Sequence, residues 1–163
     1  MSISRTVLAA IIGAVAIIFL GTLIGYAWLS KQGPVLSRSE EKDPLSGTPR
    51  SILFNPLRDR SVENAALPVI EAMRDGKCAD ALAGWERDYR KKYARFICNA
   101  EAQHPLVSWT LVDWEEHPPL TILHYRATRR SSPGEDSYYK ELFTVTIEKS
   151  GREWTVTKYD AMY

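Results

Sequence analysis

Hydrophobic residues run without interruption near the start of the chain. The segment from Val7 to Leu29 contains no charged side chain, and a helix of that length measures about 34 Å, against about 30 Å for the hydrocarbon core of a bilayer. Tyr26 and Trp28 lie near its end, where aromatic rings favour the headgroup level, and Lys31 follows as an anchor. The pattern predicts a transmembrane helix over residues 7–29, surrounded by membrane lipid, after a short tail of residues 1–6.

A cleaved secretory signal is the alternative interpretation of this segment. Its apolar region would run to only about 7–15 residues and end at a small-x-small site, and no such site follows a core of that length here. Basic residues lie on both flanks, with Arg5 before the segment and Lys31, Arg38 and Lys42 after it, so the charge count does not favour an exported C-terminus. The very short basic tail before the apolar segment nevertheless resembles the start of an export signal. We therefore expect an uncleaved signal-anchor in an inner or plasma membrane, with the C-terminal domain on the periplasmic side.

Small residues recur every four positions within the apolar segment. Ala9, Gly13, Gly21 and Gly25 share this spacing, with Ile17 in the middle. Such a ridge lets a second helix approach closely, and Gly21 to Gly25 matches the GxxxG pattern. Because glycine is common in transmembrane helices in any case, two interpretations stay open: an ordinary helix surface, or a packing face for a second copy or a partner subunit.

The composition changes abruptly over residues 30–49. This stretch contains several Pro and Gly residues, equal numbers of positive and negative charges, and few apolar side chains. Such a composition buries too little surface to offset the entropy of ordering. It predicts a flexible linker that lets the following domain reach a partner, and the alternative is a segment ordered against that domain.

Helical periodicity begins after this stretch. Apolar residues recur at helical spacing from Val62 to Met73, with Ser61 as a candidate N-cap and Gly76 as a stop. A second helical pattern runs from Leu82 to Ile97, with Gly84 as a possible interruption. The two patterns predict amphipathic helices that cover a core.

The period changes to about two from residue 106 onward, which is typical of strands. Four segments rich in β-branched and aromatic residues, at 106–114, 120–130, 137–149 and 152–163, are separated by short breaks containing Pro or Gly. Short connections favour antiparallel pairing of consecutive strands. We therefore predict a soluble α+β domain over residues 50–163, with two or three helices packed on a curved four-stranded antiparallel sheet.

This layout resembles the nuclear transport factor 2-like (cystatin-like) α+β cones, in a membrane-anchored version. The resemblance covers residues 61–163 and depends on the element order and on two local patterns: Gly76-Lys77-Cys78-Ala79-Asp80-Ala81-Leu82 opening the second helix, and Trp154-Thr155-Val156-Thr157 in the last strand. It implies either an assembly component of a bacterial secretion or envelope machine, which packs against its neighbours, or a small enzyme with an acid or base deep in the cone.

Candidate catalytic side chains are scattered over the strands. Asp113, His124, Glu141 and Asp160 are the titratable candidates, with Tyr125, Tyr139 and Tyr159 as hydroxyl partners, and no second His or carboxylate accompanies His124 at the spacing of a catalytic pair. His104, His117 and His124, with Glu115 and Glu116, lack a recognised metal-ligand spacing. We therefore expect a protein that is not an enzyme, with no cofactor and no metal.

The two cysteines, Cys78 and Cys98, leave two possibilities open. In an oxidising compartment they would form one disulfide. A straight helix would hold them about 30 Å apart, whereas a disulfide requires Cα atoms within about 7 Å, so the bridge requires a break at Gly84 or near Asn99. Otherwise they are free thiols.

Charge and composition argue against nucleic-acid binding as the function. The chain carries 21 Lys and Arg against 20 Asp and Glu, which is not the basic excess of a nucleic-acid binder. Two hypotheses remain: a single-pass accessory or scaffold protein that binds protein partners or itself, and a membrane-tethered cone that binds or transforms a small apolar ligand. The residues expected to line a ligand pocket are Trp109, Trp114, Tyr125, Phe143 and Trp154.

Overall fold

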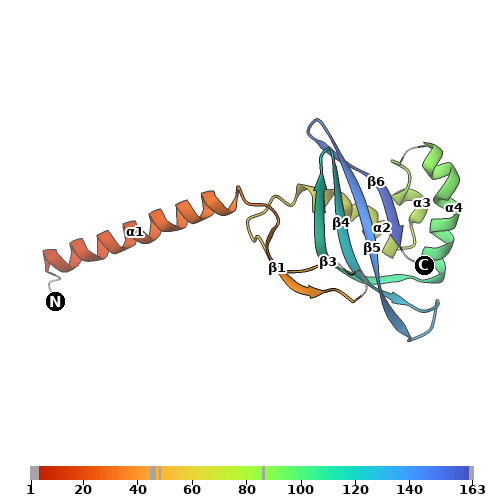
Figure 1. Cartoon of the computed structure of the whole chain (residues 1–163), viewed down its shortest axis with the longest axis horizontal. Coiled ribbons are helices and arrows are strands. Elements are labelled where there is room, and N and C mark those ends of the chain that lie inside the picture. Colours follow the sequence, from red (N-terminus) through yellow and green to blue (C-terminus); the bar gives the residue numbers. More distant parts are fainter. Residues whose placement is uncertain (1–3, 45–46, 48, 86, 162–163) are drawn as a thin grey trace.

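The apolar segment forms one long helix. The computed structural model describes residues 4–44, 47, 49–85 and 87–161, and its first helix, α1, covers Arg5–Leu29. By length and composition, Thr6–Leu29 is long and apolar enough to cross a membrane. Figure 1 shows α1 as a rod that projects from an α+β head. Residues 1–3 of the predicted tail lie outside the described residues.

A two-stranded antiparallel sheet follows α1. Strand β1, Val35–Lys42, pairs with β2, Pro49–Phe54, in a register that sets Val35 opposite Phe54. The prediction of a flexible linker over residues 30–49 was therefore wrong for β1, and the ordered head begins before residue 50. The cause is a set of ion pairs to distant strands, described below. Residues 45, 46 and 48 of that predicted linker lie outside the described residues.

The first predicted amphipathic helix is confirmed. Helix α2 covers Ser61–Arg74 and buries Val62, Ala66, Ile70 and Met73 on one face. Gly76 ends it with a positive φ of 72°, a conformation that glycine adopts without a Cβ penalty. Ser61 is not the N-cap: the helix begins at this residue, and its backbone N–H donates to Asp59 Oδ1.

The second helical pattern is confirmed from Arg87 onward, and a separate short helix precedes it. Helix α3 covers Cys78–Ala81 and α4 covers Arg87–Gln103, with a turn between them that includes Gly84. The break folds the chain back so that the Cα atoms of Cys78 and Cys98 lie 5.5 Å apart, and the two cysteines form a disulfide. Of the two possibilities left open by the sequence, the structure has the bridged one.

Four long strands form the main sheet. They are β3, Leu106–His117; β4, Leu120–Arg130; β5, Tyr138–Ser150; and β6, Glu153–Ala161. All neighbours pair antiparallel in the order β3-β4-β5-β6, which confirms the predicted meander. Figure 1 shows α2, α3 and α4 on one face of this sheet.

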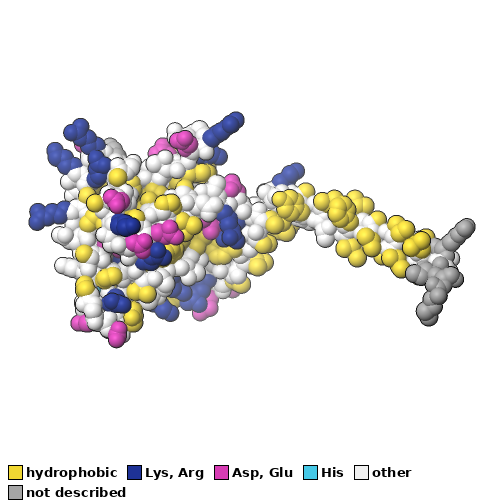
Figure 2. Space-filling model, turned by 180° about the vertical axis from the view of Figure 1, so that it is seen from behind, with side chains coloured by type: hydrophobic (Ala, Val, Ile, Leu, Met, Phe, Trp, Pro, Cys, Tyr) yellow, Lys and Arg dark blue, Asp and Glu magenta, His cyan; other side chains and the backbone are white. Residues whose placement is uncertain are grey.

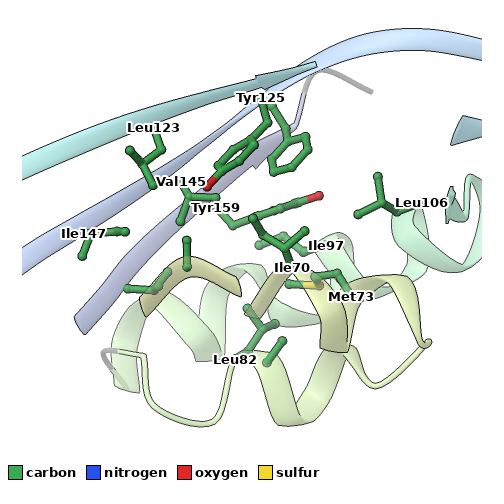
Figure 3. Close-up of a cluster of buried hydrophobic side chains, with 14 of the residues drawn as sticks. Ile70, Met73, Leu82, Ile97, Leu106, Leu123, Tyr125, Val145, Ile147 and Tyr159 are labelled. Carbon is green, nitrogen blue, oxygen red and sulfur yellow. The ribbon is translucent and has the colours of Figure 1, made fainter. Parts of the chain in front are cut away.

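The core lies between this sheet and the helices. Tyr125 and Phe143 stack at 5.0 Å between ring centroids, and Phe143 lies 5.2 Å from Tyr159. Figure 3 shows Val145 and Tyr159 pointing toward Ile70 and Met73 on α2. Burial of each large apolar side chain stabilises the head by about 1.5–3 kcal/mol, so this packing is the main source of its stability.

Candidate functional site

A groove lies between the start of α2 and the ends of the long strands. It has a volume of 370 Å³ and contains two indole rings, those of Trp114 and Trp154. Lys149 Nζ lies 5.0 Å from the centroid of the Trp154 ring. The groove is lined by Asp59, Val62, Trp114, Glu116, Pro118, Pro119, Leu120, Thr121, Lys149 and Trp154.

A second hollow extends this groove toward α1. It has a volume of 220 Å³ and is lined by Pro34, Val35, Arg38, Trp114 and Glu116. Trp114 and Glu116 belong to both hollows, so the two adjoin. The combined feature, called the Trp114 groove below, therefore begins at residues that leave α1 and extends to Trp154 on β6.

An irregularity in β3 sets the position of Trp114. The register shifts between Leu111 and Asp113, so the neighbours Asp113 and Trp114 are both buried, which strict strand alternation would forbid. The Trp114 backbone N–H donates to Asp113 Oδ1 at 2.8 Å, and its indole N–H donates to Glu116 Oε1 at 3.1 Å. These bonds hold the indole in the groove wall.

Ion pairs attach the β1–β2 hairpin to the long sheet. Arg38 Nη2 donates to Asp113 Oδ1 at 3.0 Å, and the Ser51 hydroxyl donates to the same oxygen at 3.1 Å. Asp43 is buried and pairs with Arg126 on β4, while Arg50 Nε lies 3.6 Å from Asp43 Oδ2. Since Arg126 points away from the helix-covered face, the hairpin covers the opposite face of the sheet.

The end of α1 is bonded to the hairpin by one buried amide. The Asn55 side chain is 0% exposed, and its Nδ2 donates to Leu29 O at 2.6 Å and to Gly33 O at 3.3 Å. Its backbone N–H donates to Pro34 O at 2.8 Å. Carbonyls at a helix C-terminus have no partner within the helix, and here the head supplies one. Helix and head are therefore joined by more than the covalent chain.

A buried charge cluster lies at the other end of the sheet. Arg129 is fully buried, and its guanidinium donates to Glu101 on α4, Glu141 on β5, Tyr159 on β6 and the His104 carbonyl. The hydrogen bonds occupy all five N–H donors of the group. The Tyr159 hydroxyl also donates to Glu101 Oε1 at 2.8 Å.

The electrostatics of this cluster follow from its burial. Burial raises the pKa of the Glu141 carboxyl above its ordinary value, and attraction to Arg129 opposes that rise only in part. Burial alone would lower the pKa of Arg129, but its bond to Glu101 and the nearby acidic groups raise the pKa above the ordinary arginine value. Burial also raises the pKa of Tyr159, so Arg129 stays charged and Tyr159 stays protonated.

The cluster is suited to holding elements together. Its charged and hydroxyl groups bond one another across α4, β4, β5 and β6. Only Glu141 Oε2 is buried without a hydrogen-bond partner among the described residues of this cluster. Sequence reasoning named Glu141 and Tyr159 but missed Arg129 and Glu101. The alternation Leu123, Tyr125, Ala127, Arg129 was the available signal, because it sets Arg129 on the buried face of β4.

The five predicted pocket residues do not converge on one cavity. Trp114 and Trp154 line the Trp114 groove. Tyr125 and Phe143 are only 3% and 1% exposed and belong to the filled core. Trp109 lies elsewhere, with its ring 5.6 Å from Arg74 Cζ at the end of α2. The prediction of a single aromatic pocket was wrong because strand alternation directs Tyr125 and Phe143 toward α2.

The candidate metal and acid–base residues are also dispersed. His124 Nε2 lies 3.1 Å from Glu115 Oε1, a cross-strand neighbour that sequence spacing did not reveal, and His117 Nε2 lies 3.3 Å from Glu115 Oε2. His104 Nδ1 lies 2.9 Å from Ser131 O, and Asp160 pairs with Lys158. Among the described residues, no group of three or more His, Cys, Asp or Glu side chains could hold a metal ion.

The small-residue ridge of α1 is open. Ala9, Gly13, Gly21 and Gly25 all lie on this helix, and a Cβ added at any of the three glycines would meet no other atom within 4 Å. Figure 2 shows hydrophobic side chains along α1. The described part of the chain therefore leaves this face available to a second helix.

Comparison with known proteins supplies no family. No protein family and no curated protein matches this chain. Among solved structures, the chain is similar to the solution structure of a SEC-C motif containing protein from Rhodopseudomonas palustris, with 10% identity over 66% of this chain and 84% of that chain, at a TM-score of 0.49. This likeness is too distant to carry a functional argument, which therefore rests on the residues of this chain.

Proposed function

We propose that this protein is a single-pass, membrane-anchored accessory protein whose head binds a partner membrane protein close to the bilayer. The observation that carries this proposal is the course of the Trp114 groove, which begins at Pro34 and Val35, directly after α1. A polypeptide that leaves the membrane beside α1 would meet this groove first.

The bonds at the end of α1 support an uncleaved anchor. Asn55, an ordered residue of the head, donates to the carbonyls of Leu29 and Gly33. Removal of α1 as a signal peptide would leave Asn55 without the Leu29 carbonyl. The open ridge from Ala9 to Gly25 supports lateral packing of the anchor with a partner helix or a second copy.

The Cys78–Cys98 disulfide supports a head on the non-cytoplasmic side. Structural disulfides persist in oxidising compartments and are rare in the cytosol. The proposed location is therefore an inner or plasma membrane with the head in the periplasm. An NTF2-like cone whose interior is filled by Tyr125 and Phe143 is suited to packing against neighbours.

The Trp114 groove is suited to an apolar segment of a partner protein. Two indoles, Pro118, Pro119 and Leu120 supply apolar contact, while Lys149 and Glu116 lie at its sides. Aromatic residues of this kind are enriched where partners bind. The alternative occupant is a small apolar ligand, and the experiment below separates the two.

Site-directed photo-crosslinking in intact cells tests this function. A photoreactive phenylalanine analogue replaces Trp154 in the groove, and in a matched control it replaces Trp109, which lies outside the groove. We expect irradiation to attach a discrete membrane protein to position 154 and not to position 109. Mass spectrometry of the adduct identifies what occupies the groove.

Three results would contradict the proposal. A small-molecule adduct at position 154 would support the apolar-ligand alternative. Equal adducts at positions 154 and 109 would show unspecific contact, and the absence of any adduct at position 154 would show that the groove has no occupant in the cell.

A further inference from the structure

Exposed apolar side chains lie close in the chain to the buried amide that joins head and helix. On β2, Ile52 and Leu53 are 65% and 53% exposed, and Leu57, in the following turn, is 37% exposed. Consecutive strand residues point to opposite faces, so one of Ile52 and Leu53 would normally be covered by protein. Here both are exposed, so among the described residues the head covers neither side chain.

Asn55 ties this part of the chain to the end of α1. This residue bonds to the Leu29 carbonyl at the last turn of α1. Leu53 and Leu57 are two residues away on either side, which limits their distance from Asn55 to about 7 Å along the chain. The headgroup layer extends about 5–7 Å beyond the hydrocarbon core. If α1 spans the bilayer, this reach allows Leu53 and Leu57 to enter that layer.

The neighbouring part of α1 has the composition of an interfacial segment. Tyr26 and Trp28 are both exposed on the last turns of the helix, and such rings are enriched at the headgroup level. Figure 2 shows hydrophobic surface continuing from α1 onto the adjoining part of the head. Leu53 and Leu57 are close in the chain to Asn55, which bonds to Leu29, so they extend the apolar surface of α1 toward the head.

We infer that Ile52, Leu53 and Leu57 form a second membrane contact, which inserts into the lipid headgroup region beside α1. This contact goes beyond the proposed protein-binding function, although it rests on the membrane span proposed for α1. Together with the Asn55 bonds, it gives the head two points of attachment to the bilayer. The orientation of the Trp114 groove relative to the membrane is then restricted.

Lipid-attached quenchers test this contact in the full-length protein. Single cysteines replace Leu53, Leu57, Ile17 and Val107, each is labelled with an environment-sensitive fluorophore, and each protein is placed in nanodiscs at one chain per disc, with the native disulfide oxidised. Ile17 reports on the span itself. Val107 is exposed at the start of β3, directly after α4, and Figure 1 shows α4 on the side of the head away from α1.

We expect probes at positions 53 and 57 to emit at shorter wavelength than the probe at position 107. We also expect them to lose most of their intensity when the lipids carry a shallow quencher, whereas position 107 keeps its intensity. Circular dichroism of each labelled protein verifies that the head is folded.

The controls separate failure of this contact from failure of the membrane span. Quenching at position 17 without quenching at positions 53 and 57 would overturn the membrane contact and leave the span intact. No quenching at position 17 would overturn both. Shielding of positions 53 and 57 only at two chains per disc would show that a second copy covers this surface, and that result would also overturn the contact.

Discussion

At the scale of single residues, the buried guanidinium of Arg129 is the most consequential side chain of the head. It joins the end of α4 to three strands through Glu101, Glu141 and Tyr159. A buried ion pair adds little net stability over a well-packed apolar core, but removal of one partner leaves an uncompensated charge in the interior. The cluster therefore constrains which elements meet.

The first prediction concerns this arginine. Arg129→Met leaves Glu101 and Glu141 buried without their cation, so we expect the free energy of unfolding to fall by about 3–5 kcal/mol. Urea titration in detergent, followed by tryptophan fluorescence, measures this loss. Arg87→Met, at an exposed position of α4, is the matched control, and equal stability of the two variants would contradict the prediction.

The second prediction concerns pH. The pKa of Glu141 is raised by burial from an ordinary value of 4.5, so the folded state binds this proton more tightly than the unfolded state. The stabilisation that comes from this tighter proton binding is fully present below pH 4.5. It is lost as the pH rises through the pKa of Glu141 in the folded state. Because Glu141→Gln does not titrate, the stability of this variant relative to the native protein should increase with pH across that interval. Parallel curves in urea titrations at several pH values would refute the assignment.

At the scale of elements, two connections decide the architecture: the junction between α1 and the hairpin, and the disulfide between α3 and α4. The first is made by hydrogen bonds from Asn55. The second closes the turn around Gly84 and brings Cys78 and Cys98 together. Both connections fix the relative position of two elements, which the local sequence pattern does not predict.

The third prediction tests the junction. Asn55→Ala removes the donor to the Leu29 carbonyl, which should cost about 1–3 kcal/mol and loosen the head relative to α1. Spin labels at positions 17 and 107 should then give a broader distance distribution. Asn64→Ala, at an exposed position of α2, should leave the distribution narrow, and a narrow distribution in both variants would show that Asn55 does not restrain the head.

The fourth prediction tests the disulfide. The bridge joins residues that are 20 positions apart. Loss of a cross-link that closes a loop of that size should destabilise the head by about 3 kcal/mol in the chain-entropy account. We expect the Cys78→Ser/Cys98→Ser variant to melt at a lower temperature than the oxidised protein. Reductant should bring the native protein to the same melting temperature and leave the variant unchanged; a reductant-insensitive native protein would argue against the bridge.

At the scale of the whole molecule, the chain combines an apolar rod with a head that is attached to its end (Figure 1). The Trp114 groove begins where the rod ends, so the binding surface lies near the proposed membrane. Under the proposed function, the partners that bind this groove are proteins close to the same bilayer.

The fifth prediction concerns topology. If the head lies outside the cytoplasm, alkaline phosphatase fused to the C-terminus should be active, because that enzyme folds only where disulfides form. A fusion to a fluorescent protein that matures only in the cytoplasm should stay dark. The reverse pattern would place the head in the cytoplasm and remove the support that the Cys78–Cys98 bridge provides for export.

Local periodicity was sufficient to predict the apolar helix, α2 and the four-stranded meander. Each of these elements is defined by the spacing of its own side chains, as with Val62, Ala66 and Ile70 on α2. Short connections then restrict consecutive strands to antiparallel neighbours. No contact with distant residues is needed for these conclusions.

The other features of the fold depend on contacts between residues that are far apart in the chain. Composition predicted a flexible linker, but Arg38 pairs with Asp113 and Asp43 pairs with Arg126 across the fold, so β1 is ordered against the long sheet. Likewise, no periodicity shows that Arg129 meets Glu101, or that Trp114 and Trp154 share a groove while Phe143 fills the core.

The sequence by itself therefore determined the apolar helix, α2 and the four long strands, because periodicity is a local property of the chain. Only the tertiary structure decided how α1 joins the head, where charges are buried and which aromatic rings remain accessible. These features depend on strand register and on ion pairs between residues that are many positions apart, and their free energy is realised only once the chain has folded.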